Sequence, residues 1–472
     1  MLPLHRMMAV QSLPNRFPRL VGGCLLMALA ISHVVAATPH YVFAHYMVCF
    51  STYGQTLDGY KRDIQEAQAA GLDGFALNVG AWDATQVYYQ TNVALMYAAA
   101  EQLGTGFKLL FSVNFGGESN VVDMVRSYAD RTNSFRYNGR IVLSAWGGNN
   151  VPLAGWTGLD WTNSIIGELK KEGIPIFFTP FFYSNPVNEL PNYGNATELL
   201  GRYGNLLDGL FVWTAAGLPP QLAACNADYA KAVHLAGKTI MGSVCATYWG
   251  MSQYGLSRRY YEFDGGEGLA LQWNAIITNQ PDWVEICTWN DFNESTYISP
   301  IEDPGVYEAQ LQTPRRYSHK GYLELSKRFI TWYKTGQPPT IENDAVYYFY
   351  RTHPKDLVAA NTNDVWVGWR TGVVADTLYT TVFLIGPAQL EINSGGNWTT
   401  NILSAGQHQL RTPFSPGPQQ LTLRRNGVAV ISAQGPDILA TIQAYDFFTA
   451  SGYAYGTTVR PAPPDNMKLT HP

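Results

Sequence analysis

Eight short β-rich runs between residues 40 and 335 constrain the fold of this 472-residue chain more than any other feature. Helical patterns follow five of them, at residues 57–70, 86–103, 162–172, 219–235 and 321–333. Strands that alternate with helices predict parallel βαβ units, and eight units predict an α/β fold of the (β/α)8 TIM-barrel type over residues 38–336. A doubly wound open sheet shows the same alternation, but no G-x-G-x-x-G motif follows the first run. The eight runs are residues 41–48, 74–79, 107–113, 140–146, 175–182, 209–213, 239–245 and 283–289.

The pattern changes after the segment Gly336-Gln-Pro-Pro339. Helical periodicity fades, and short alternating runs are separated by Gly, Pro and Asn. Such runs are typical of antiparallel strands, so we predict a β-sandwich accessory domain over residues 340–472. The clearest runs are residues 345–350, 364–369, 380–384, 419–424 and 427–431.

The N-terminus has the pattern of a targeting segment. Arg6, Arg16 and Arg19 precede an apolar run over residues 20–35, and the small residues Ala36 and Ala37 follow it. A basic region, an apolar core and a small-residue exit are typical of a secretory signal peptide. The alternative is an uncleaved membrane anchor, which needs about 20 apolar residues, and this run is shorter. We therefore predict a signal peptide at residues 1–37, a secreted protein and no membrane contact after cleavage.

Composition narrows the class of ligand. Aromatic residues make up 13% of the chain and charged residues only 14%. Aromatic side chains combine an apolar body with a polar tip, which suits the C–H faces and hydroxyls of sugar rings. The net charge of −5 and the scattered Lys and Arg residues argue against the basic surface of a nucleic-acid-binding protein. A neutral carbohydrate is the favoured partner, although β-rich secreted proteins also carry many aromatic residues for packing.

Cysteines and sequons fit an exported chain. The sequons at Asn195 and Asn397 are glycosylation candidates. An even number of cysteines after the signal peptide permits one or two disulfides, and their spacing matches no metal site. No metal or organic cofactor is expected. The four cysteines are Cys49, Cys225, Cys245 and Cys287.

The densest chemical signal follows the last strand run, where Trp289, Asn290, Asp291 and Glu294 stand within six residues. Active sites of TIM-type barrels lie at the carboxyl ends of the strands, and two carboxylates three residues apart can both enter that mouth. Glycoside hydrolysis needs such a pair, one to protonate the departing oxygen and one to activate water. Asn290 is predicted to bind sugar hydroxyls, and Trp289 to form a platform beneath the sugar. The alternative is a capping cluster, because an Asp N-cap with Glu three residues later opens many helices.

Further candidates follow other strand runs. Asp83, after the second run, is a candidate third catalytic acid, with an N-cap for the following helix as the alternative. His45 and Asn78 end the first and second runs and are predicted to bind hydroxyls; a core histidine with satisfied hydrogen bonds is the alternative for His45. The chain contains neither G-x-S-x-G nor H-E-x-x-H, so serine-hydrolase and zinc-protease chemistry find no support. The rim aromatic residues predicted to contact sugar are Trp146, Trp213 and Trp249.

These segments resemble glycoside hydrolase family 71, the α-1,3-glucanases often called mutanases. The resemblance implies a (β/α)8 barrel with a C-terminal β-sandwich, inverting hydrolysis of α-1,3-glucan, and Asp291 and Glu294 as the essential carboxylates. Asp83 is similar to a further acidic residue of the family. The family motif commonly reads WND-Tyr/Trp-Gly-Glu, and here Phe292 and Asn293 replace the aromatic-Gly pair. The matching segments are residues 42–48, 63–80, 107–112 and, above all, 288–298.

The sequence therefore predicts a secreted, monomeric glycoside hydrolase that cuts α-1,3-glucan within the chain. Glu294 is predicted as the general acid and Asp291 as the group that activates water, together with Asp83; the reverse assignment stays open. The first alternative is an endo-α-mannosidase-like enzyme on a related barrel. The second is a secreted glycan-binding or cell-wall protein without catalysis. The C-terminal domain is either a carbohydrate-binding module or a stabilising partner.

Overall fold

The computed structural model describes residues 40–149, 151, 158–187, 190–250, 259–301, 317–361 and 373–456. The predicted signal peptide, residues 1–37, and the predicted strand at residues 364–369 lie outside these ranges. In the described part of the chain, no helix combines the length and the apolar character that a bilayer span requires.

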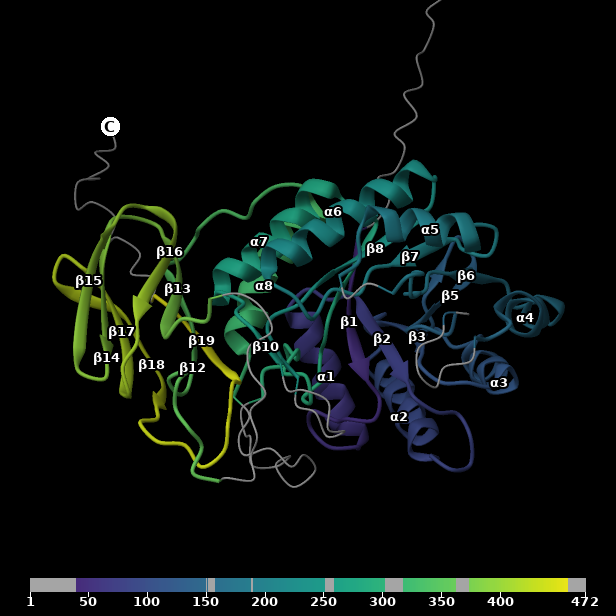
Figure 1. Ribbon diagram of the computed structural model, residues 1–472, viewed down its shortest axis with the longest axis horizontal. Helices are drawn as coiled ribbons and strands as arrows, with labels where there is room; N and C mark the ends of the chain where they lie inside the picture. Colours follow the sequence, from purple (N-terminus) through teal and green to yellow (C-terminus); the bar gives the residue numbers. More distant parts are fainter. Residues whose placement is uncertain are drawn as a thin grey trace, which may run out of the picture. The chain divides into compact units, whose positions relative to one another are not determined.

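A curled, mostly parallel sheet organises residues 40–286 (Figure 1). All eight predicted strand runs are confirmed as strands of this sheet, and their order is β6-β5-β3-β2-β1-β11-β8-β7, with every neighbouring pair parallel. A short strand, β4 (Arg136–Tyr137), pairs antiparallel with β5. The eight parallel strands are β1 (Tyr41–Met47), β2 (Gly74–Val79), β3 (Lys108–Val113), β5 (Arg140–Ala145), β6 (Ile176–Phe178), β7 (Gly209–Phe211), β8 (Thr239–Val244) and β11 (Trp283–Ile286).

The two ends of this strand order approach each other. The Asp208 N–H donates to the Phe178 carbonyl at 3.0 Å, and the Phe211 N–H donates to the Pro180 carbonyl at 2.9 Å. The Asp208 carboxylate also accepts the Phe178 N–H at 2.9 Å. These bonds join the chain around β6 to the chain around β7, although no regular ladder forms between the two strands in the described residues.

Helices follow the strands, and the predicted ones are confirmed: α1 (Leu57–Ala69), α2 (Tyr88–Leu103), η1 (Trp161–Gly167) with α4 (Glu168–Lys171), α6 (Pro219–Leu235) and α8 (Lys320–Thr335). The sequence did not predict three further helices, α3 (Glu118–Tyr128), α5 (Tyr193–Tyr203) and α7 (Gly265–Asn279). Two of these helices contain residues of low helix propensity, which weakens their signal in the sequence: α3 is rich in Val, and α7 opens with Gly-Gly-Glu-Gly. Tertiary packing stabilises them instead, as the fully buried Trp273 of α7 illustrates.

The strands have a two-residue side-chain period, which divides the space they surround into layers. One buried apolar cluster takes a residue from each of the eight parallel strands: Phe43, Ala76, Leu110, Val142, Phe177, Phe211, Met241 and Trp283. Two positions further toward the carboxyl end, most of the side chains are polar. These residues are His45, Asn78, Ser112, Ser144, Thr179, Trp213, Ser243 and Glu285, and all except Trp213 are buried. The apolar layer therefore supports a polar layer that faces the carboxyl ends of the strands.

Two antiparallel sheets of four strands follow α8. Their orders are β16-β13-β12-β19 and β15-β14-β17-β18. One buried apolar cluster includes residues from both sheets, among them Val346, Leu378, Leu390 and Leu423. The first sheet also contacts α7 and α8 (Figure 1). The strands are β12 (Ala345–Arg351), β13 (Thr377–Leu384), β14 (Ala388–Ser394), β15 (Asn397–Leu403), β16 (Gly406–Pro413), β17 (Gly417–Arg425), β18 (Val428–Ile438) and β19 (Thr449–Tyr455).

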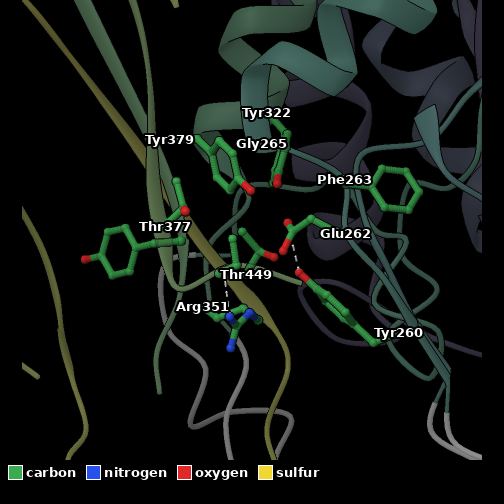
Figure 2. A pocket seen from close by; sticks show the side chains of 11 residues that line it. Tyr260, Glu262, Phe263, Gly265, Tyr322, Arg351, Thr377, Tyr379 and Thr449 are labelled. Atoms are coloured by element: carbon green, nitrogen blue, oxygen red, sulfur yellow. Dashed lines mark hydrogen bonds between the residues drawn. The ribbon is translucent and has the colours of Figure 1, made fainter. Parts of the chain in front are cut away.

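A small polar cavity of ≈ 10 Å³, about the size of one water molecule, lies where the segment after β10 (Arg259–Tyr261) meets α8 and the first antiparallel sheet (Figure 2). Glu262 points into this space; its Oε1 is 3.4 Å from the Tyr260 hydroxyl, and its Oε2 has no hydrogen-bond partner among the described residues. Burial raises the pKa of Glu262 to about 7, although the nearby positive charge of Arg351 lowers it.

Glu262 therefore makes folding stability depend on pH. The carboxyl is protonated in both states below its ordinary pKa of 4.5, whereas between about pH 4.5 and 7 the unfolded chain loses this proton first. Folding stability consequently falls across that window. We expect Glu262→Gln to have a free energy of unfolding higher than that of the parent by up to about 3 kcal/mol at pH 8. At pH 4.5 the two proteins should differ little.

Equilibrium urea unfolding at the two pH values measures the difference. Arg351 keeps its 2.7 Å ion pair with Asp376 in the variant, so the substitution does not strand a buried cation. The exposed Glu342→Gln serves as the matched control and should behave like the parent at both pH values. An equal shift of Glu262→Gln at both pH values would contradict the titration argument.

Candidate active site

The segment after β11 is a compact loop that closes on itself. The Thr288 N–H donates to the Thr296 carbonyl at 2.9 Å, and the Ile298 N–H returns to the Thr288 carbonyl at 3.0 Å. The Trp289 N–H donates to the carbonyl of His45 at 2.7 Å, which ties the loop to the end of β1. The predicted carboxylates thus lie on a loop that its own backbone and the neighbouring strand hold in shape.

Asp291 organises this loop. Its Oδ1 accepts the backbone N–H groups of Asn293 at 3.1 Å and Glu294 at 3.2 Å, and its own N–H donates to Thr288 Oγ1 at 2.8 Å. The side chain therefore does what a capping residue does, but no helix begins within residues 292–301. Asp291 is 8% exposed, and these bonds fix its position.

Glu294 is held from a different element. The Tyr248 hydroxyl, on β9 (Tyr248–Gly250), donates to Glu294 Oε1 at 3.0 Å, and Arg259 Nε donates to the Tyr248 oxygen at 3.2 Å. The Trp249 N–H donates to the Glu294 carbonyl at 2.9 Å. The antiparallel pair β9 and β10 thus supports Glu294 through both side chain and backbone.

The two carboxyl groups influence each other's ionisation. Burial raises the pKa of Asp291, the negative charge of Glu294 raises it further, and the two backbone N–H donors act in the opposite direction. Burial also raises the pKa of Glu294, while the Tyr248 hydroxyl and the Arg259 charge lower it. Both groups therefore bind a proton more tightly than exposed carboxyls do, and ionisation of one makes ionisation of the other harder.

Partly exposed aromatic rings gather around Trp146. The Trp146 ring lies 5.6 Å from the Tyr183 ring and 6.2 Å from the Trp213 ring, measured between centroids. Burial raises the pKa of Tyr183, and the negative charge of Glu294 raises it further. The structure thus brings Trp146 together with Trp213 and with Tyr183, the ring that the charge of Glu294 influences.

His45 and Asn78 form a buried polar chain within the polar layer. His45 Nδ1 lies 2.5 Å from Glu285 Oε1, and Asn78 Nδ2 lies 2.9 Å from His45 Nε2. Trp213 packs edge-on against the His45 ring, with centroids 4.9 Å apart. His45 is 1% exposed and both of its ring nitrogens have partners, so the alternative of a satisfied core histidine describes it well. Asn78 is 4% exposed and shares this role beneath the aromatic rings.

Three residues that were predicted to contact sugar are buried in the structure, and their contact with sugar stays a prediction. Trp289 is fully buried and donates its Nε1–H to Asp63 Oδ1 at 2.7 Å. Trp249 is 1% exposed and packs against Phe447 and Phe448.

Asn290 is also fully buried, and its amide bonds to the backbone of the chain that leaves β1. Its Oδ1 accepts the Met47 N–H at 2.7 Å, and its Nδ2 donates to the carbonyls of Met47 and Phe50. Trp289, Trp249 and Asn290 therefore hold the carboxylate loop against the neighbouring parts of the chain.

Asp83 has the contacts of a turn residue. Its Oδ1 accepts the Thr85 N–H at 2.7 Å and the Thr85 hydroxyl at 2.5 Å, just before α2. These hydrogen bonds lower its pKa. This geometry matches the capping alternative, and the carboxylate is neither buried nor raised in pKa as those of Asp291 and Glu294 are. A catalytic role for Asp83 stays a prediction.

Sequence reasoning missed three residues that shape the site, and it gave Tyr248, an aromatic residue at a strand end, no contact with the carboxylates. Glu285 carried a signal, because it is the charged residue within the apolar run Trp283-Val-Glu-Ile286. Asp63 and Arg259 carried no local signal, since they reach the loop from distant segments, and Tyr248 was only one aromatic residue among many. No group of three or more His, Cys, Asp or Glu residues in the described chain is suited to bind a metal ion. The four cysteines are free thiols, so the permitted disulfides are not formed.

Comparison with known proteins agrees with this chemistry. The model of glycosyl hydrolase family 71 matches residues 38–462, most of the chain. The chain belongs to glycosyl hydrolase family 71. It is therefore a glycoside hydrolase, as the resemblance implied.

Named members of family 71 align along most of their length. A mutanase of Penicillium rubens is 29% identical over 88% of this chain and 89% of its own length. The glucan endo-1,3-alpha-glucosidase agn1 of Schizosaccharomyces pombe is 27% identical over 88% of this chain and 94% of its own. Among solved structures, the GH99 endo-alpha-mannosidase of Bacteroides thetaiotaomicron is 13% identical, with a TM-score of 0.45 over 63% of this chain and 99% of that protein.

Proposed function

We propose that this family 71 enzyme hydrolyses α-1,3-glucan within the chain, with inversion at the anomeric carbon. The observation that carries the proposal is the pair Asp291 and Glu294, two carboxyls with raised pKa values on one loop at the carboxyl end of β11. Such a pair supplies the acid and the base that glycoside hydrolysis requires. The names of the aligned relatives support α-1,3-glucan as the polymer.

We assign the general acid to Glu294 and the general base to Asp291. Hydrogen bonds to an anion favour the ionised form, and Asp291 accepts two backbone N–H groups that suit a base. Glu294 loses its proton to the departing oxygen, and the Tyr248 hydroxyl then stabilises the new anion. Because the charge of one carboxylate raises the pKa of the other, the pair holds one proton more readily than it loses both, and the assignment places this proton on Glu294.

We propose that the sugar-binding surface of the enzyme includes Trp146 and Trp213, with Tyr183 beside Trp146. These rings are partly exposed, whereas the other residues of the layer that contains Trp213 are buried. His45 and Asn78 are proposed to hold the Trp213 ring and the floor of this surface. An inverting mechanism places the two carboxyls about 6.5–9.5 Å apart, which leaves room for the attacking water.

We further propose that the eight parallel strands close into a full barrel, and that the two C-terminal sheets form a β-sandwich. The backbone hydrogen bonds from Asp208 and Phe211 across the β6–β7 gap support closure. The apolar layer supports it as well, because each of the eight strands contributes one residue. The apolar cluster that both antiparallel sheets share supports the sandwich.

Secretion as a monomer completes the proposal. The basic and apolar pattern at residues 1–37 supports export and removal of a signal peptide, after which residues 38–336 form the catalytic part and residues 340–472 the accessory domain. An extracellular enzyme can reach an insoluble cell-wall polymer that does not enter cells.

A substrate panel tests the proposal. We expect the enzyme to release soluble oligosaccharides from insoluble α-1,3-glucan at least about 100-fold faster than from mannan or from β-1,3-glucan, because the sugar-binding surface must fit one linkage geometry. Reducing-end assays with chromatography of the products measure the rates and show whether internal bonds are cut. Preferred cleavage of mannan would establish the mannosidase alternative, and binding without cleavage would establish the glycan-binding alternative.

A further inference from the structure

The second antiparallel sheet exposes one whole face. In β14 and β17, buried residues alternate with exposed or partly exposed ones, as expected when one face packs and the other meets solvent. Leu390, Ile392, Leu421 and Leu423 point into the shared apolar cluster. The side chains between them form the opposite face, together with those of the flanking strands β15 and β18.

An exposed tryptophan and a row of amides cross this face. The strand register pairs Trp398 with Asn393, Asn393 with Gln420, and Gln420 with Gln434, so the four side chains form one line across all four strands. Neighbouring strands lie about 4.8 Å apart, so the line is roughly 14 Å long. Trp398 is 62% exposed, and it is the one tryptophan among the exposed large apolar side chains of the described residues.

The charge of this face selects the kind of ligand. The row itself is uncharged, and the neighbouring ions Glu391 and Arg424 pair with each other, Nε to Oε2, at 2.9 Å. An anionic or cationic ligand would find no unpaired charge of opposite sign in the row. Amides that both donate and accept hydrogen bonds, beside an open aromatic ring, instead complement hydroxyls and C–H faces.

We propose that the row Trp398, Asn393, Gln420 and Gln434 is a second binding site, for a neutral polysaccharide chain. It lies on a different sheet from the catalytic loop and makes none of the contacts of Asp291 or Glu294. The identity of the polysaccharide as α-1,3-glucan rests on the proposed function. The site holds the enzyme on the surface of the insoluble polysaccharide while Asp291 and Glu294 hydrolyse its glycosidic bonds.

Binding of the full chain to insoluble α-1,3-glucan particles tests the site. Every protein carries Glu294→Gln, so that the particles are not consumed, and is produced without N-glycosylation, so that Asn397 stays unmodified. Depletion from the supernatant gives the dissociation constant. We expect Trp398→Ala to weaken binding about tenfold or more, since it removes the aromatic contact, and Gln420→Ala to weaken it severalfold.

The matched control is Val428→Ala, which trims another exposed apolar residue of the same sheet, 65% exposed, outside the row. It should bind within about twofold of the parent. With Glu294 restored, Trp398→Ala should cleave soluble α-1,3-oligosaccharides at the parental rate and insoluble glucan more slowly.

Two results overturn the site: Trp398→Ala binding as tightly as the parent, or Val428→Ala losing as much affinity as Trp398→Ala. A separate failure concerns the catalytic proposal. An enzyme that binds α-1,3-glucan through Trp398 but does not cleave it leaves the second site standing and removes the proposed activity.

Discussion

Glu294→Gln and Asp291→Asn should each lower the rate of α-1,3-glucan hydrolysis by about 10³-fold or more while the protein stays folded. General acid–base catalysis contributes about 10²–10⁴-fold, and each amide keeps the size of the carboxyl but removes its ability to exchange a proton. Asp291→Asn retains a carbonyl oxygen that can accept the Asn293 and Glu294 N–H groups. Initial rates of reducing-sugar release measure activity, and thermal unfolding confirms the fold.

A substrate with a good leaving group separates the two roles. A glycosyl fluoride needs little protonation of its leaving group, so Glu294→Gln should recover much of its rate on it, whereas Asp291→Asn should stay inactive because water still lacks a base. The opposite pattern would assign the acid to Asp291. Exposed Glu342→Gln is the control and should match the parent. Parental activity in both active-site variants would remove the two-carboxylate mechanism altogether.

Asp63→Ala should lower the free energy of unfolding by about 3–5 kcal/mol, more than any other substitution proposed for this protein, and should also lower activity. Asp63 is 1% exposed, and its carboxylate accepts the Trp289 Nε1–H at 2.7 Å and the Tyr46 hydroxyl at 2.9 Å. Without it, two buried donors lose their acceptor, and each such loss costs about 1–3 kcal/mol in addition to the empty volume. Because Trp289 lies two residues before Asp291, the loosened loop should also lose catalytic precision.

Urea unfolding of Asp63→Ala and Asp63→Asn measures this effect. The Asn variant keeps an acceptor oxygen and should lose about half as much stability as the Ala variant. Asp58→Ala, in the first turn of the same helix, removes a carboxylate that is 94% exposed and should cost less than about 1 kcal/mol. If Asp63→Ala proved no more destabilising than Asp58→Ala, the buried acceptor would not be what holds Trp289.

The strands of the curled parallel sheet were predictable because each is a short apolar run between polar turns, a pattern typical of buried parallel strands. The helices α3, α5 and α7 were not, because their propensities are weak and long-range packing decides them. The α7 residue Gln272 shows the difficulty: its amide reaches Cys245, 27 residues earlier, to bond both the backbone N–H and the carbonyl.

That Asp291 and Glu294 lie on one loop was predictable for a similar reason, since they are neighbours in one motif, whereas their catalytic roles stay a prediction. The supports of this loop were not predictable. His45 and Glu285 are 240 residues apart, and nothing local in the sequence indicates that they meet. Burial of Trp249 and Trp289 was equally hidden, because an aromatic residue at a strand end reads the same whether its ring faces a sugar or the core.

The packing of Trp249 on Phe447 and Phe448 joins the N-terminal and C-terminal halves of the chain, and this contact has a consequence for how the gene can be divided. Tyr248, the residue before Trp249, donates a hydrogen bond to the Glu294 carboxylate. The rings of Phe447 and Phe448 therefore support Glu294 indirectly, through Trp249 and its neighbour Tyr248. A gene fragment that ends after the curled parallel sheet would encode a protein without the Phe447 and Phe448 rings that pack on Trp249. We therefore expect recombination to keep the curled sheet and the two C-terminal sheets together.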